Sequence, residues 1–259
     1  LDVNFGVVPW IGMLAAMLIS LAVSLVVVLV SFKHRGVFFS LVTIGFTEIV
    51  RILLIYFKDV TGGSNGLYIT WRGSNFAKLT FNSDTPFFYI LMVVTACIFF
   101  IAWRIENTRL GYYLRAIRAD EDAAESLGIQ SYKVKMKAFS ISAVMASVVG
   151  VFFAYYLTYI DPNAVGALSI STKIGAMAIV GGIGTLYGPL IGAAVLIPMT
   201  EISNILLGST GSGMLLYGLV MLLIIILRPG GVISFFRKDN NSARIQKYLR
   251  REELKDAHS

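Results

Sequence analysis

Long runs without a charged residue alternate with shorter polar segments along most of this chain. A helix of about 20 apolar residues crosses the hydrocarbon core of a bilayer, and the runs are apolar throughout instead of alternating like barrel strands. The pattern therefore predicts an all-α polytopic integral membrane helical bundle. The charge-free runs cover residues 7–32, 87–103, 138–160, 174–200 and 202–227, and a sixth stretch at 36–57 is largely apolar but carries Glu48 and Arg51.

The composition supports this prediction. Of the 259 residues, 56% are hydrophobic and 14% are charged, against about 25% charged in a typical soluble domain. These values exclude a disordered chain, a disulfide scaffold and a water-soluble globule. The first run is too long for a signal-peptide core and follows no basic segment. Because the chain begins at Leu1, we expect a mature or truncated product in which upstream helices can be missing.

Basic residues predict the orientation in the membrane. The formal net charge is +7, and three clusters hold 17 of the 22 Lys and Arg residues. These clusters lie at 33–35, at 104–137 and in the tail from Arg228 onward. Because cytoplasmic loops are enriched in Lys and Arg, we expect all three clusters and the C-terminus in the cytoplasm. The loops at 58–86 and 161–173 then lie outside, provided that 174–207 enters from the outside and returns there.

Glycine interrupts the run at 174–200 in the sequence GGIGTLYGP. Gly181, Gly182 and Gly184, followed by Gly188 and Pro189, weaken a helix in the middle of the membrane. Such a break is tolerated only where neighbours or a cavity satisfy the backbone. We expect a glycine-rich broken-helix hairpin of two half-helices. Two interpretations stay open, a translocation path between short helices and close helix packing at small residues.

The polar segment 104–137 has helical order. Ala116, Ala123 and Leu127 fall near one face of a predicted helix over 115–128, and Ile117 and Ala124 widen that face. Gly128 provides a stop. The segment suits docking into a groove of another protein, or it is a solvated helix that links two spans.

Resemblance to a known family favours docking. Asp122-Ala123-Ala124 with Gly128 resembles the EAA-x-x-x-G loop of ABC importer permeases, with Asp in place of Glu. Other stretches are similar to the LivM type of branched-chain amino acid permease, in the family's order and from about residue 35 to 232. They are RGVFFSLVTIGFTEIVR followed by TGGSNGL, RAIRADEDAAESLGIQSYKVKMKAFSISA, and GGIGTLYGPLIGAA followed by LRPGGV.

The resemblance implies a transmembrane permease domain at 1–232 and a basic cytoplasmic tail at 233–259. It also implies two permease chains, two cytoplasmic ABC ATPases and an external substrate-binding protein. The 104–137 loop would couple the ATPases to the pore. The residues expected to act in that coupling are Arg115, Arg118, Asp122, Ala123, Ala124, Glu125 and Gly128.

Polar residues at membrane depth are the candidates for the translocation path. Glu48 and Arg51 are three apart, so they lie on one helix face, and Thr43 and Thr47 are nearby. Charges there are costly and usually face an interior or water. They form either a polar lining for a zwitterionic amino acid or a structural ion pair. Together with the three glycines Gly181, Gly182 and Gly184, these four residues complete the candidate path.

The predicted function is the permease subunit of an ATP-driven ABC importer for branched-chain or related amino acids, in a bacterial or archaeal inner membrane. The alternatives are the same machine with urea, short amides or a sugar as cargo, and a secondary transporter or channel. We expect no enzyme, because no nucleophile–base or metal spacing stands out. No phosphate-binding G-x-x-x-x-G-K motif occurs, so ATP is expected in a partner and no cofactor in this chain. Membrane lipid is an expected partner and nucleic acid is not.

Overall fold

Helices dominate the parts of the chain that the computed structural model describes. These parts are residues 9–31, 37–69, 81, 83–207 and 231–233, together with five single positions between 218 and 226. The chain divides into two compact units, Leu1–Leu168 and Ser169–Ser259. The predicted basic tail lies outside the described residues from position 234 onward.

Four long helices build the first unit: α2 (Pro9–Ser31), α3 (Val37–Tyr56), α5 (Asp84–Glu106) and α8 (Ser131–Leu157). They coincide with the first four apolar stretches of the sequence. Among the described residues, five helical segments are long and apolar enough to cross a membrane, and no more than 22% of any of these windows is buried. Leu18 on α2 is 68% exposed and Phe38 on α3 is 69% exposed. Side chains of this kind suit lipid, so the predicted all-α membrane fold is confirmed.

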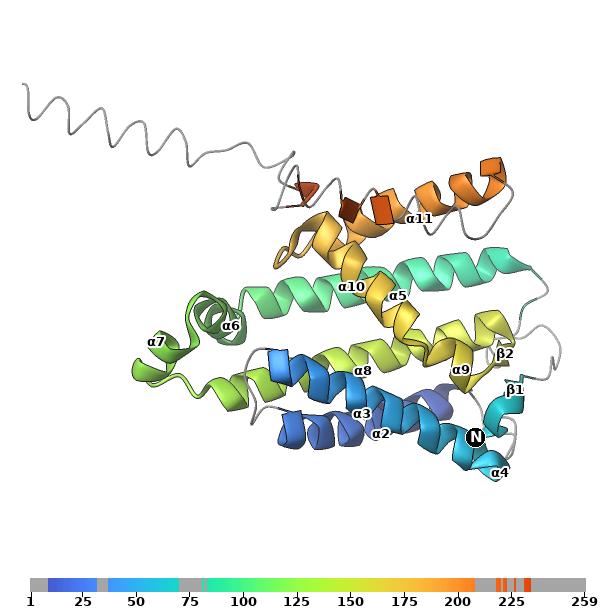
Figure 1. Ribbon diagram of the computed structural model, residues 1–259, viewed down its shortest axis with the longest axis horizontal. Helices are drawn as coiled ribbons and strands as arrows, with labels where there is room; N and C mark the ends of the chain where they lie inside the picture. The colour runs from blue at the N-terminus through green and yellow to red at the C-terminus, as the bar shows by residue number, and fades with distance from the viewer. Residues whose placement is uncertain are drawn as a thin grey trace, which may run out of the picture. The chain divides into compact units, whose positions relative to one another are not determined.

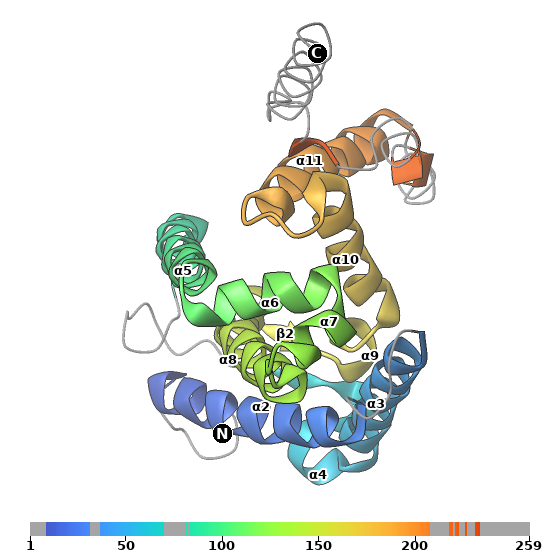
Figure 2. The ribbon, with the colours of Figure 1, turned by 90° about the vertical axis from the view of Figure 1, so that its left-hand side faces the viewer.

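Short elements gather at the two opposite ends of this unit (Figure 1), and Figure 2 looks onto the end that carries α6 and α7. At one end lie α6 (Arg109–Ala119) and α7 (Glu121–Ser126), between α5 and α8 in the chain. At the other end, β1 (Leu67–Tyr68) pairs antiparallel with β2 (Tyr159–Ile160). The remaining short elements at that end are α4 (Lys58–Thr61), the 3-10 turn η1 (Gly63–Asn65) and α9 (Pro162–Val165). The segments predicted to face opposite sides of the membrane therefore lie at opposite ends of the unit.

Serine side chains connect α2 to α8, the helix pair with the most extensive contact in this unit. The Ser20 hydroxyl donates to the Ala143 carbonyl at 2.8 Å, and the Ser24 hydroxyl lies 3.4 Å from that of Ser140. Val28 beside them is fully buried. Small polar residues let helices approach closely in lipid, and their side chains form hydrogen bonds across the interface.

The second unit contains the glycine-rich hairpin, formed by α10 (Leu168–Gly182) and α11 (Gly188–Leu207). The arms have 15 and 20 residues. At 1.5 Å per residue they are about 22 and 30 Å long. The sequence predicts a hairpin of two helices joined at a glycine-rich turn, and the structure has this arrangement. The glycines lie in the turn and where the two helices touch. Pro198 lies inside α11 without ending it.

Candidate functional site

The segment predicted to couple the protein to an ATPase is a pair of helices, not one. The expected single helix over 115–128 is interrupted at Asp120, which has the extended angles φ −160° and ψ 116°. The Asp120 carboxylate accepts the backbone N–H of Ala123 at 3.0 Å and caps α7. Aspartate at a helix start satisfies an N–H that has no partner within the helix. Side-chain capping therefore outweighs the continuous periodicity, and the prediction of one helix was wrong.

The break changes which side chains are buried. Ile117 on α6, Ala124 on α7 and Val134 on α8 form a small buried cluster. Ala123 is exposed, and Leu127 is 83% exposed. The face expected from Ala116, Ala123 and Leu127 is therefore not formed as one surface, because each helix turns its own apolar side toward α8. Leu127 instead stands out as an unexpected apolar side chain on the surface.

Hydrogen bonds and ion pairs hold the two short helices in place. The Arg115 guanidinium donates to the Glu106 carbonyl at 3.1 Å and lies over the Tyr112 ring. The Lys135 ammonium lies 2.5 Å from the Glu121 carboxylate. Gly128 ends α7 with φ +86°. The remaining predicted residues Arg118, Asp122 and Glu125 lie on the exposed side of this helix pair.

Glu48 and Arg51 form an ion pair near the end of α3 that carries α4. The Arg51 Nε lies 3.1 Å from both Glu48 carboxylate oxygens. Its Nη1 donates to the side-chain carbonyl of Asn163 on α9 at 2.8 Å. The position Gly166 just beyond α9 would bring an added Cβ within 3.2 Å of the Arg51 Cγ. The pair therefore connects α3 to α9, and Asn163, which the sequence analysis missed, is its third member.

The two candidate threonines of α3 bond to their own helix. Thr43 Oγ1 donates to the Phe39 carbonyl at 3.0 Å, and Thr47 Oγ1 donates to the Thr43 carbonyl at 2.9 Å. Threonine inside a membrane helix commonly satisfies its hydroxyl in this way. This geometry and the ion pair fit the structural interpretation of the polar face, and a role in translocation stays a prediction.

The TGGSNG turn closes the same end of the unit. Gly62, Gly63 and Gly66 all have positive φ. A Cβ at Gly66 would lie 2.5 Å from the Ile160 carbonyl oxygen, so only glycine fits against β2. The Tyr159 hydroxyl donates to the Asn65 carbonyl at 3.3 Å. Burial, reinforced by the charge of Asp161, raises the pKa of the Tyr159 phenol.

Glycines bring the backbones of α10 and α11 into contact. A Cβ at Gly181 would lie 1.7 Å from the Gly188 carbonyl oxygen, and one at Gly192 would lie 1.8 Å from that of Met177. Gly184 has φ +72° within the turn. Two members of the contact were not predicted: Gly192, and Gly231, whose added Cβ would meet the Gly182 backbone at 2.6 Å. The Val232 N–H donates to the Val180 carbonyl at 2.8 Å.

No group of His, Cys, Asp and Glu side chains that could hold a metal ion occurs within the described residues. Of the site residues predicted from the sequence, the structure brings Glu48 together with Arg51. It also packs Ala124 against Val134, near the start of α8. The second unit holds the three candidate glycines.

A family model and several individual proteins that resemble this chain point to the same family. The family model described as the permease component of the branched-chain amino acid transport system matches residues 2–225. The high-affinity branched-chain amino acid permease LivM of Salmonella typhimurium is 29% identical over 90% of this chain. LivM of Escherichia coli is 30% identical over 79% of it. The autoinducer 2 import permease LsrC of Yersinia pseudotuberculosis is 28% identical over 48%.

The chain covers only part of these relatives, since the matched regions are 59% and 52% of the two LivM proteins. No solved structure has significant similarity to the chain.

Proposed function

The chain belongs to the family of permease components of branched-chain amino acid transport systems, and we propose that it is a membrane-spanning subunit of an ATP-driven importer. Its cargo is branched-chain or related amino acids, delivered by an external binding protein. Two ATPase subunits power it, and a second permease chain completes the pore. Similarity to LivH of Salmonella typhimurium, 28% identical over 66% of this chain, supports such a pair of related permeases.

The observation that carries this proposal is the construction of the α6–α7 pair. Ile117 and Ala124 anchor it to the base of α8, and the Lys135–Glu121 pair adds a second attachment. The opposite side presents Asp122, Ala123 and the 83% exposed Leu127. A small rigid element with an exposed apolar side chain can fit a groove on an ATPase and transmit its movement to α8. Coupling between distant sites requires such an element with two positions.

Reconstitution with ATPases and a binding protein tests the proposal. Leu127→Asp should lower ATP-driven uptake at least tenfold, because a charge would enter the apolar part of the docking groove. Leu127→Met keeps the apolar surface and should retain most of the uptake. Both substitutions replace an exposed side chain, so neither should change the thermal stability of the permease.

A second variant acts on the geometry of the element. Gly128→Pro cannot adopt the observed φ of +86°. It also removes the N–H that donates to the Glu125 carbonyl at 2.9 Å. Combined with charge reversal at Asp122, it should abolish coupling. Uptake that is unchanged in this variant, or that survives ATP depletion and collapses with an uncoupler, would favour a secondary transporter and contradict the proposal.

The cargo is the less constrained part of the proposal. One relative, LsrC, is named as a permease for the import of autoinducer 2, so similar permeases differ in their named cargo. Urea, short amides and sugars are therefore alternative cargoes for the same machine. A thermal-shift screen of the binding protein against these compounds and branched-chain amino acids would distinguish them.

The remaining elements of the proposal follow the charge pattern. The location is the cytoplasmic membrane of a bacterium or archaeon, with α6, α7 and the C-terminus in the cytoplasm. The candidate path comprises Thr43, Thr47, Glu48 and Arg51 on α3 and Gly181, Gly182 and Gly184 in the hairpin. The chain itself is proposed to bind no nucleotide.

A further inference from the structure

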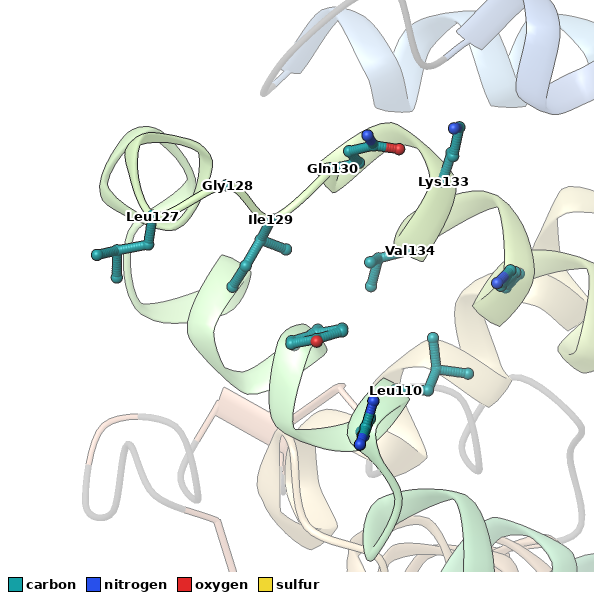
Figure 3. A pocket seen from close by; sticks show the side chains of 10 residues that line it. Leu110, Leu127, Gly128, Ile129, Gln130, Lys133 and Val134 are labelled. Carbon is teal, nitrogen blue, oxygen red and sulfur yellow. The ribbon is translucent and has the colours of Figure 1, made fainter.

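A cavity of about 560 Å³ lies at the end of the first unit that carries α6 and α7. Figure 3 shows it between α6, the α7–α8 connection and the first turns of α8, with Val134 pointing toward its centre and Lys133 and Gln130 on its rim. Leu110, Ile129 and Val134 supply apolar wall, and the cavity is also lined by Leu127 and Gly128, where contact with an ATPase is proposed. The charged side chains that line it are all cationic: Arg109, Lys133 and Lys137.

The three cations differ from the other basic side chains nearby. Lys135 pairs with Glu121, and Arg115 pairs with Glu106. Among the described residues, no carboxylate forms an ion pair with Arg109, Lys133 or Lys137. Lys133 and Lys137 are four apart and therefore share one side of α8. The cavity is thus lined by three cations that have no carboxylate within ion-pair distance among the described residues.

The start of α8 adds to this potential. The Gln130 side chain at the N-cap makes no capping hydrogen bond. The N-terminus of a 27-residue helix carries a partial positive charge that favours anions close to it. The cations and the helix end act in the same direction, so the cavity attracts an anionic group.

The position of the lysines relative to the membrane indicates which kind of anion can reach the cavity. Lys137 directly precedes the charge-free run 138–160, where α8 enters the predicted hydrocarbon region. Lys133 lies one turn earlier, about 6 Å along the axis. The headgroup layer of one leaflet is about 5–7 Å thick. Both lysines therefore lie at headgroup level, and basic pockets at this level are suited to anionic lipid.

We propose that this cavity binds the headgroup of an anionic phospholipid in the leaflet next to α6 and α7. Arg109, Lys133 and Lys137 contact the phosphate, while Leu110, Ile129 and Val134 contact the glycerol and the first methylenes of the acyl chains. The lipid then supports the base on which α6 and α7 rest. The inference depends on the membrane location of the chain and not on ATP coupling.

Native mass spectrometry of the full-length permease, purified in detergent with the subunits that accompany it, tests the binding. Phosphatidylglycerol and phosphatidylcholine are titrated separately after delipidation. The double substitution K133Q/K137Q should weaken phosphatidylglycerol binding roughly tenfold to thirtyfold, since each cation near an anionic surface contributes several-fold. K135Q is the matched control, because Lys135 lies between these residues on α8 but pairs with Glu121 and does not line the cavity. Its affinity should equal that of the unmodified protein.

Four outcomes would overturn the proposal. The first is equal binding of phosphatidylglycerol and phosphatidylcholine, which would exclude recognition of the anion. The second is equal weakening by K135Q, which would indicate a general effect of charge. The third is unchanged lipid binding by K133Q/K137Q with loss of an accompanying subunit, which would identify the cavity as a protein-docking site. Glycerol 3-phosphate that competes as well as the lipid would likewise show that the site recognises a soluble phosphate.

Discussion

Two glycines mark where the backbones of α10 and α11 touch. An added Cβ at Gly192 would lie 1.8 Å from the Met177 carbonyl oxygen, and one at Gly181 would lie 1.7 Å from that of Gly188. No side-chain carbon tolerates such distances, so the helices would have to separate. The backbones therefore pack closely at small residues, which is one of the two interpretations of the GGIGTLYGP sequence.

Gly192→Ala should destabilise the protein by about 1–3 kcal/mol, the usual cost of forcing extra volume into a packed contact. Gly175→Ala is the control, because it lies on α10 with no described atom within 4 Å of an added Cβ. That change should be neutral or stabilising by up to about 1 kcal/mol, since alanine favours a helix over glycine. Thermal unfolding in detergent measures both, and equal melting temperatures would refute the backbone contact.

The cap at Asp120 gives a second prediction at the residue scale. Asp120→Ala removes the acceptor of the Ala123 N–H and should cost about 1 kcal/mol of local stability in α7. Amide hydrogen exchange across 121–126 should then become roughly fivefold faster. Asp120→Ser keeps an acceptor at the cap and should restore slow exchange. If the serine variant exchanged as fast as the alanine variant, capping would not be what separates α6 from α7.

At the scale of elements, the Arg51 side chain joins a membrane helix to a short helix beyond it. Its guanidinium bonds to Glu48 on α3 and to Asn163 on α9. The β1–β2 pair joins the same end of α3 to the end of α8, with Leu67 opposite Ile160. Segments about a hundred residues apart in the sequence are thus connected at one end of the unit.

A double-mutant cycle between Arg51→Met and Asn163→Ala should show non-additive effects on the free energy of unfolding, because either substitution alone already removes the hydrogen bond. Arg51→Met paired with Val165→Ala is the control, because Val165 is exposed on the same short helix. That second cycle should show additive effects. Unfolding in denaturant provides the free energies, and additivity in the first cycle would show that the α3–α9 contact contributes nothing.

For the whole molecule, the predicted orientation places the two ends of the first unit on opposite sides of the membrane. Ser64 lies exposed in η1, and Ser126 lies exposed on α7. These positions offer matched sites for labelling. The single cysteine Cys97, exposed on α5, can be replaced by serine to give a background without thiols.

In that background, a membrane-impermeant thiol reagent should label Ser64→Cys in intact cells. It should label Ser126→Cys only after permeabilisation, because the positive-inside rule places α7 in the cytoplasm. The reverse result would invert the topology and remove α6 and α7 from reach of any cytoplasmic ATPase. Labelling of both positions from one side would contradict the predicted crossing of the membrane by α5, which lies between them.

Much of the fold was predictable because lipid imposes a simple requirement. A backbone in hydrocarbon must satisfy its own hydrogen bonds, so a long charge-free run becomes a helix whatever its neighbours are. For this reason the runs 7–32 and 87–103 correspond to α2 and α5 with small shifts at the ends, and the run 138–160 corresponds to α8, which begins earlier, at Ser131. The 104–137 segment is polar, and lipid imposes no such requirement there. Asp120 caps α7 instead of continuing the helix, so the prediction of one helix over 115–128 was wrong.

By itself the sequence determined the class of protein, its membrane helices, the glycine hairpin and the family. Each of these depends on composition, on periodicity or on residues adjacent in the chain. The tertiary structure decided which atoms meet: Asn163 with Arg51, Gly192 with Met177, and Ala124 rather than Ala123 with α8. It also gathered Arg109 with Lys133 and Lys137 around one cavity. Such contacts depend on distances between segments far apart in the chain, and no spacing along a single helix encodes those distances.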